Sequence, residues 1–295
     1  MKKITSRWPH QQSLKVEWNI GKRCNLDCSY CPPEIHDNYS PHTDIRVLKT
    51  CVDKLTEIEK PLRISFTGGE PCVHPKISEL FHYARHYASW INVTTNGTRK
   101  AEWYAKQPLD HIVFSLHFET RDWEQHLLNI IDTHELVDIP MQVNIMAHHE
   151  HMANVKFAAM LLQNKKIKYV IRRIRWTESH DWFDDMRYNQ KDLDWILENE
   201  ASALPNCEVD GEFFIHANDI IKKHDNQFEG WSCNIGLESL MINWNGEVHR
   251  ATCRVGGSLG NIYKGEFSIP NEPVICSRNW CTCAADIPIT KEKND

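Results

Sequence analysis

The sequence predicts an α/β fold: a partial (β/α)6 TIM-like barrel followed by a small C-terminal unit that contains a β-hairpin. Between residues 15 and 175, six short β-rich runs alternate with amphipathic runs, the pattern of parallel strands joined by right-handed crossovers. Six such units are fewer than the eight of a closed barrel, so the barrel should be open. Near the C-terminus, Asn245-Gly246 separates two β-rich runs, which is a strong hairpin signal.

Each expected strand is short and rich in β-branched or aromatic residues. The strands are expected at residues 16–20, 63–66, 91–94, 111–116, 142–146 and 169–174. Apolar residues recur at helical spacing between them, which predicts helices at 44–58, 77–87, 102–106, 123–134, 153–164 and, later, 191–200. Because barrels of this type carry their chemistry at the C-terminal ends of the strands, the residues after each strand are the first candidates for a site.

Three segments are expected along the chain: an N-terminal extension at 1–14, the partial barrel at 15–205, and the smaller unit at 206–295. The hairpin strands of the smaller unit should be 239–243 and 247–250. Cys233 and Cys253 flank this hairpin, so pairing of its strands would bring the two thiols towards each other.

Composition excludes several classes of protein. The net charge of −6 argues against a broad nucleic-acid-binding face. No apolar run is long enough to span a bilayer, and the first residues lack the apolar core of a signal peptide, so we expect a cytoplasmic protein. Cytosolic thiols stay reduced, and the eleven cysteines therefore indicate metal or cluster ligands rather than a disulfide framework.

The clearest motif is a group of three cysteines directly after the first expected strand. Cys24, Cys28 and Cys31 follow a CxxxCxxC spacing, which lets one loop place three thiolates around a cubane. A typical [4Fe–4S] cluster has four cysteine ligands, so three local ones leave one iron open for another ligand. A zinc site, or a cluster completed by a distant fourth cysteine, is the alternative.

This motif, with the aromatic Tyr30 before its last cysteine, resembles the signature of the radical S-adenosylmethionine (SAM) superfamily. Thr67-Gly68-Gly69-Glu70-Pro71 after the second strand resembles the family's GGE motif, and its glycines should let the backbone approach a ligand. Thr95-Asn96-Gly97 after the third strand resembles the TNG turn of the SAM pocket. The resemblance implies these SAM-binding candidates: Tyr30, Gly68, Gly69, Glu70, Pro71, Thr95, Asn96, Ser115, Asn144 and Arg173.

Arg173 is the least determined of these candidates. Arg172, Arg173 and Arg175 lie in and just after the sixth strand and alternate in face, so only one face can point inwards. An inward arginine would suit the carboxylate of SAM or an anionic substrate.

Five cysteines in the C-terminal segment supply a second set of candidate ligands: Cys233, Cys253, Cys276, Cys281 and Cys283. Cys233, then Gly246, then Cys253 is similar to the opening of the SPASM and twitch auxiliary-cluster domains, although six residues separate Gly246 from Cys253 where that family usually has four. The resemblance implies one auxiliary [4Fe–4S] cluster. Which of the five thiols is not a ligand stays open, and a structural zinc site is the alternative.

The resemblance also implies an activity. A reduced [4Fe–4S] cluster would cleave SAM to a 5′-deoxyadenosyl radical that abstracts hydrogen from a small-molecule or peptide substrate. Net oxidation or cross-linking is expected, with the auxiliary cluster as electron acceptor and reduced flavodoxin or ferredoxin as electron donor. An epimerase or other redox-neutral reaction is one alternative. A non-catalytic iron–sulfur electron-transfer protein or a zinc-binding interaction module is the alternative of another class. The oligomeric state is not predicted.

Overall fold

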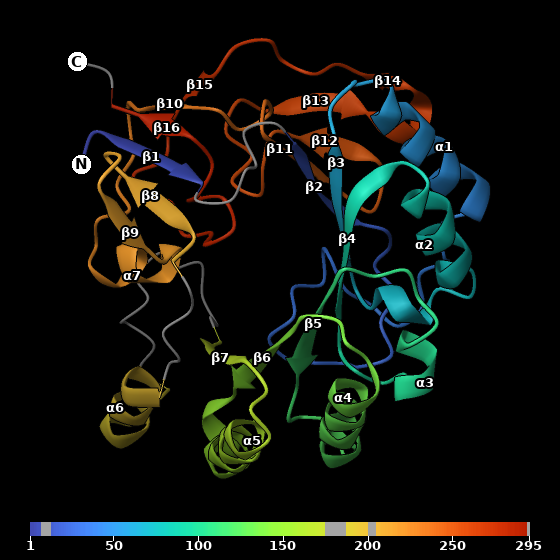
Figure 1. Ribbon diagram of the computed structural model, residues 1–295, viewed down its shortest axis with the longest axis vertical. Helices are drawn as coiled ribbons and strands as arrows, with labels where there is room; N and C mark the ends of the chain where they lie inside the picture. Colours follow the sequence, from blue (N-terminus) through green and yellow to red (C-terminus); the bar gives the residue numbers. More distant parts are fainter. Residues whose placement is uncertain (7–12, 175–186, 200–204, 294–295) are drawn as a thin grey trace.

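A computed structural model describes residues 1–6, 13–174, 187–199 and 205–293. Its main feature is a ten-stranded sheet in the order β14-β13-β12-β11-β2-β3-β4-β5-β6-β7 (Figure 1). Strands β2 to β7 are parallel neighbours in chain order, as the sequence predicts. They are β2 (Leu14–Asn19), β3 (Leu62–Thr67), β4 (Ala88–Thr95), β5 (His111–Leu116), β6 (Met141–Ala147) and β7 (Tyr169–Arg173).

The expected helices are all present within a few residues of their predicted limits. They are α1 (Ile45–Thr56), α2 (Ile77–Arg85), α3 (Ala101–Tyr104), α4 (Trp123–Leu136), α5 (Met152–Asn164) and α6 (Gln190–Asn199). Helices α1 to α5 cover the outer face of the parallel strands (Figure 1). No helix in the described ranges is sufficiently long and apolar to pass through a bilayer.

The parallel strands have one apolar face and one polar face. In β5, Ile112, Phe114 and Leu116 are buried, whereas the alternating residues are half-buried. The buried set packs with the helices in one core, because successive side chains of a strand point to opposite faces. The other face is rich in polar side chains and lines the inside of the barrel.

The sheet is linear rather than closed, with β7 at one edge and β14 at the other, which confirms a partial barrel. Four C-terminal strands extend it beyond β2: β11 (Ser239–Ile242), β12 (Glu247–His249), β13 (Ser258–Asn261) and β14 (Glu266–Phe267). β11 pairs parallel to β2, and β11 and β12 form the predicted hairpin.

A second, six-stranded sheet has the order β15-β10-β16-β1-β8-β9. Its strands are β1 (Lys3–Ser6), β8 (Cys207–Val209), β9 (Phe213–Ile215), β10 (Ser232–Cys233), β15 (Val274–Ile275) and β16 (Lys291–Glu292); α7 (Ala217–Lys222) packs beside them. Strand β1 lies between β16 and β8, so the first residues of the chain belong to the same sheet as nearly the last (Figure 1).

The strand pairing therefore crosses the segment limits expected from the sequence. Residues 3–6, within the expected N-terminal extension, form β1, which is paired on both sides. Likewise, residues 206–295 do not form one independent unit, since β11 to β14 continue the barrel sheet. Local composition could not show this, because it carries no information about which distant strands pair.

Candidate functional site

The three-cysteine loop leaves the C-terminal end of β2 and folds back on itself. The backbone N–H of Cys24 donates to the carbonyl of Asp37 at 2.7 Å, and the Asp37 N–H donates to the carbonyl of Lys22 at 3.1 Å. The Cys31 N–H donates to the carbonyl of Cys28 at 3.0 Å. These bonds fold the loop. Cys24 and Cys31 both act electrostatically on Cys28, so the three thiols lie near one another at the C-terminal end of β2.

The three thiols have an environment that suits a metal cluster. Burial is the main reason why the pKa rises to about 11 for Cys24 and Cys31 and to about 12 for Cys28. The thiols would thus be neutral near pH 7 without a cation, and a bound metal deprotonates a coordinating thiol. The Leu26 N–H points at Cys24 Sγ, 3.4 Å away, where it can stabilise a thiolate. Within the described residues, no three histidine, cysteine, aspartate or glutamate side chains are arranged to hold a single metal ion. A [4Fe–4S] cubane does not need three side chains around a single ion, because each thiolate binds a different iron.

The two glycines after β3 lie against the backbone of the cysteine loop. A Cβ on Gly69 would lie 2.1 Å from the carbonyl oxygen of Lys22 and 2.5 Å from that of Arg23, and a Cβ on Gly68 would lie 2.5 Å from the carbonyl oxygen of Gly21. The glycines therefore admit the backbone of the cysteine loop. That they also let the backbone approach a ligand stays a prediction from the sequence. The Gly69 N–H donates to the Gly21 carbonyl at 2.9 Å, which fixes the loop to β3.

Glu70 joins the ends of β3 and β4. Its buried carboxylate accepts bonds from the Cys72 N–H at 2.8 Å, the Thr95 hydroxyl at 2.8 Å and the Asn96 N–H at 2.6 Å. Burial raises the pKa of this carboxyl, and these bonds oppose that rise. Pro71 follows at the start of a buried single turn, η2 (Pro71–Val73). The described contacts thus place Glu70, Pro71 and Thr95 inside the fold, where they stabilise the ends of β3 and β4.

Asn96 connects the end of β4 to the cysteine loop. Its side-chain amide donates to Asn25 Oδ1 at 2.8 Å and lies 4.0 Å from Cys24 Sγ. The ends of β2, β3 and β4 therefore meet at the first cysteine, as the motif positions predict.

Ser115 and Asn144 are neighbours in register on β5 and β6 and share the polar inner face of the barrel. Arg172 lies 3.5 Å from Asn144 Oδ1 through its Nε. Arg173, the residue named from the sequence, pairs in register with the buried Ala147 and so belongs to the opposite face. The geometry therefore places Arg172 on the inner face and not Arg173, while Arg175 lies outside the described residues.

Two residues just after β5 were missed by the sequence analysis. The Tyr30 hydroxyl lies 2.6 Å from His117 Nδ1, and the same nitrogen lies 3.5 Å from Cys28 Sγ. Burial is the main cause that lowers the pKa of His117 to about 4, so its ring is neutral. Glu119 accepts from the backbone N–H of Ser29 at 2.9 Å and from its hydroxyl at 2.7 Å. The sequence carried one signal for His117 and Glu119: they follow directly after a strand, as the residues of the other motifs do.

The C-terminal cysteines come from both sheets: Cys253 lies in the loop between β12 and β13, whereas the other four lie in or beside β10, β15 and β16. Four of them line one small cavity: Cys233, Cys253, Cys276 and Cys281. Cys283 is absent from this lining, and the charges that act on it include Glu17 and Lys15 of the barrel. Burial raises the pKa of Cys253 to about 11 and raises the pKa of Cys233 and Cys281 as well.

Lys291 stabilises the wall of this cavity. Its buried ammonium group donates to the carbonyls of Asp286, Ile287 and Ile289 at 2.9–3.0 Å. Three backbone acceptors around one cation hold the turn after the last cysteine in place.

Comparisons with known proteins agree with the geometry. Residues 18–173 match the sequence profile described as "Radical SAM superfamily". The Fe-coproporphyrin III synthase of Methanosarcina barkeri (strain Fusaro / DSM 804) is 34% identical over 84 residues, 28% of this chain and 21% of that protein. The PqqA peptide cyclase of Gluconobacter oxydans (strain 621H) is 27% identical over 149 residues, 45% of this chain and 41% of that protein. The chain thus matches about a fifth to two fifths of the length of these relatives.

Solved structures share the fold at low sequence identity. "Native anSMEcpe with bound AdoMet and Cp18Cys peptide" aligns with a TM-score of 0.58 and 14% identity, covering 86% of this chain and 78% of that one. SuiB of Streptococcus suis, bound to its precursor peptide SuiA, aligns with a TM-score of 0.57 and 14% identity, covering 87% and 64%. At this identity the likeness establishes the fold alone.

Proposed function

Since this chain belongs to the radical SAM superfamily, we propose that it oxidises or cross-links a small-molecule or peptide substrate by a radical mechanism. The observation that carries the proposal is the three-cysteine loop, fixed by Gly69 and Asn96 at the C-terminal ends of β2 to β4. Cys24, Cys28 and Cys31 would hold a [4Fe–4S] cluster, which would supply the electron for cleavage of SAM to methionine and a 5′-deoxyadenosyl radical; that radical would take a hydrogen atom from the substrate.

The residues of the chain would hold and orient these groups. The inner-face side chains of Ser115, Asn144 and Arg172 offer hydroxyl, amide and guanidinium groups to SAM or to the substrate beside it. Glu119 holds the middle of the cysteine loop through Ser29, which limits its movement during turnover.

A second electron must leave the substrate radical if the reaction is a net oxidation. We assign an auxiliary [4Fe–4S] cluster to Cys233, Cys253, Cys276 and Cys281, because these four thiols line one cavity, and we leave out Cys283. A reduced flavodoxin or ferredoxin would supply the first electron. The peptides bound by the anSMEcpe and SuiB structures make a peptide side chain one reasonable substrate class.

Anaerobic reconstitution followed by an assay for 5′-deoxyadenosine tests the activity. We expect SAM cleavage with the wild-type chain and none after Cys28→Ala. Cys51→Ala is the matched control, since Cys51 is a buried core thiol on α1. A chain that holds iron but yields no 5′-deoxyadenosine would indicate an electron-transfer protein, and a colourless zinc-loaded chain would indicate an interaction module.

Iron analysis tests the auxiliary site. The wild type should hold about eight irons per chain, for two cubane clusters. A Cys253→Ala/Cys281→Ala double variant should hold about four, and Cys283→Ala should keep about eight. Loss of a cluster in Cys283→Ala would contradict the ligand assignment.

A further inference from the structure

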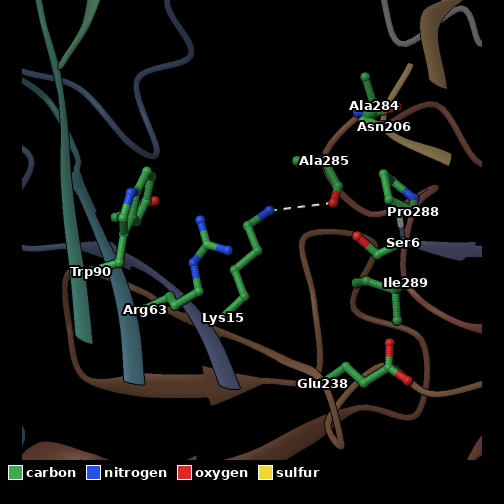
Figure 2. A pocket seen from close by; sticks show the side chains of 11 residues that line it. Ser6, Lys15, Arg63, Trp90, Asn206, Glu238, Ala284, Ala285, Pro288 and Ile289 are labelled. Atoms are coloured by element: carbon green, nitrogen blue, oxygen red, sulfur yellow. Dashed lines mark hydrogen bonds between the residues drawn. The ribbon is translucent and has the colours of Figure 1, made fainter. Parts of the chain in front are cut away.

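A separate cavity lies at the opposite end of the barrel from the cysteine loop, between the two sheets. It has a volume of about 200 Å3. Figure 2 shows Trp90, Arg63 and Lys15 on one wall, and Ser6, Pro288 and Ile289 on the other. The first wall comes from the N-terminal halves of β2 to β4, and the second from β1 and the segment before β16.

Two cations on neighbouring strands define the first wall. Lys15 and Arg63 are register partners on β2 and β3, and Arg63 is the register partner of Trp90 on β4. The Arg63 guanidinium lies over the Trp90 ring, 4.5 Å from its centroid, and the other neighbour of Trp90 is the stacked ring of His111, 6.0 Å away. Stacking on a rigid aromatic ring restricts the orientation of the guanidinium, so the fork can meet a planar anion with little loss of entropy.

Lys15 and Ser6 supply further donors. The Lys15 ammonium group donates to the carbonyl of Ala285 at 3.3 Å (Figure 2). It carries three N–H donors, and this is its one acceptor within the described part of the chain. Ser6 is 9% exposed, and its hydroxyl has no hydrogen-bond partner among the described residues. A buried hydroxyl without a partner is costly unless a ligand or water satisfies it.

Glu238, the acidic residue of the cavity lining, already accepts hydrogen bonds from other groups of the chain. Glu238 accepts from the side chain of Asn234 at 2.8 Å and from the N–H of Thr290 at 2.9 Å, one bond at each carboxylate oxygen. It therefore fixes the second wall, while the cations on the first wall favour an anion. The remaining lining is mostly apolar, including Ala284, Ala285 and Ile289.

We propose that this cavity binds an oxyanion, a carboxylate or a phosphate, carried on a short apolar stem. Arg63 and Lys15 would take its charge, the Ser6 hydroxyl would donate to it, and the apolar lining at Ala284, Ala285 and Ile289 would pack against its stem. The volume suits one end of a substrate, since pockets that enclose a whole drug-sized ligand measure about 300–1,000 Å3. That the occupant belongs to the substrate rests on the proposed function.

The position of the cavity fits recognition at a distance from the reacting carbon. Lys15 lies near the start of β2, and Asn19 is its last residue, next to the cysteine loop. The four-residue separation corresponds to about 13 Å along the strand. Binding energy from a remote, non-reacting group can orient a substrate for reaction elsewhere.

Calorimetric titration of the reconstituted full chain, without reductant or SAM, tests the proposal. Phenylacetate and phenyl phosphate are the probes, and phenylacetamide is the uncharged control for the carboxylate. We expect at least one oxyanion to bind, and the amide to bind about tenfold more weakly or worse. The tighter of the two oxyanions identifies carboxylate or phosphate as the preferred group.

Substitutions then assign the site. Arg63→Met and Lys15→Met should each weaken oxyanion binding about tenfold, and Ser6→Ala about threefold. Lys165→Met, at an exposed ion pair with Glu135, is the matched control and should change nothing. Arg63→Lys keeps the charge without the fork and should bind with intermediate affinity; it also replaces Arg63→Met if that variant does not fold.

Two results would overturn the proposal: neither oxyanion binding more tightly than the amide, or unchanged affinity in the folded Lys15 and Arg63 variants. Because the titration involves no SAM cleavage, its failure leaves the proposed activity standing. A chain that binds the oxyanion but yields no 5′-deoxyadenosine would refute the activity alone.

Discussion

Gly69→Ala should separate the cysteine loop from β3 and weaken cluster binding. The new Cβ would lie 2.1 Å from the carbonyl oxygen of Lys22, whereas ordinary van der Waals contact is 3.4–4 Å, so the backbone must move by more than about 1 Å. The bonds from the N–H groups of Gly69 and Glu70 to the loop, each 2.9 Å long, would then be lost. Overpacking costs about 1–3 kcal/mol and each lost bond about 0.5–1.5 kcal/mol.

A total near 3 kcal/mol corresponds to about 100-fold weaker retention of the cluster. Iron released to a chelator from the reconstituted protein measures this, together with the melting temperature of the chain. Gly21→Ala is the matched control in the same loop, because a Cβ there meets nothing within 4 Å. Equal iron retention in Gly69→Ala and the wild type would refute the argument that the GGE segment serves to seat the loop.

Three further predictions concern stability. Glu70→Gln should lower the free energy of unfolding, measured with urea, by about 2–4 kcal/mol, because the new amide N–H₂ would face a backbone or hydroxyl donor. Glu79→Gln removes one partner of an exposed ion pair and is the control; it should lower the free energy of unfolding by less than about 1 kcal/mol. Lys291→Met should lower the free energy of unfolding by about 3 kcal/mol, because it leaves buried carbonyls without their donor. Hydrogen exchange should then accelerate at β16, the strand that contains Lys291. The hydrogen bonds from Arg46 lower the pKa of Asp44, the N-cap of α1, to about 2. The stability that this cap gives α1 should therefore be present above about pH 4 and lost as the pH falls towards 2. Circular dichroism of the metal-free chain can follow this loss.

Each of these has a result that would contradict it. A Glu70→Gln chain as stable as Glu79→Gln would mean that the buried carboxylate does not join β3 to β4. Unchanged exchange at β16 in Lys291→Met would place the stability of that segment elsewhere. An Asp44→Asn chain keeps a capping side chain that does not titrate, so it should lose less stability than the wild type between pH 4 and 2. An equal loss would show that other carboxyl groups account for the transition.

Short-range patterns in the sequence predicted much of the barrel. Strand periodicity of two and helix periodicity of 3.6 depend on neighbours a few residues apart, and they located β2 to β7, their helices and the β11–β12 hairpin. The spacing of Cys24, Cys28 and Cys31 is also local, and a loop that wraps one cubane needs nothing more distant. These features could therefore be read without knowing which segments meet.

Only the tertiary structure decided which distant residues lie together. Residues 3–6 pair with residues 207–209 and 291–292, and Ser6 faces Arg63 across a cavity that no local pattern describes. His117 and Glu119 reach the cysteine loop although about 90 residues separate them from it. The sequence determined the cluster motif and the units of the barrel because those depend on spacing along the chain. Tertiary structure decided the supporting contacts, the inward arginine and the cavity between the two sheets, because these depend on how strands far apart in sequence share one sheet and one face.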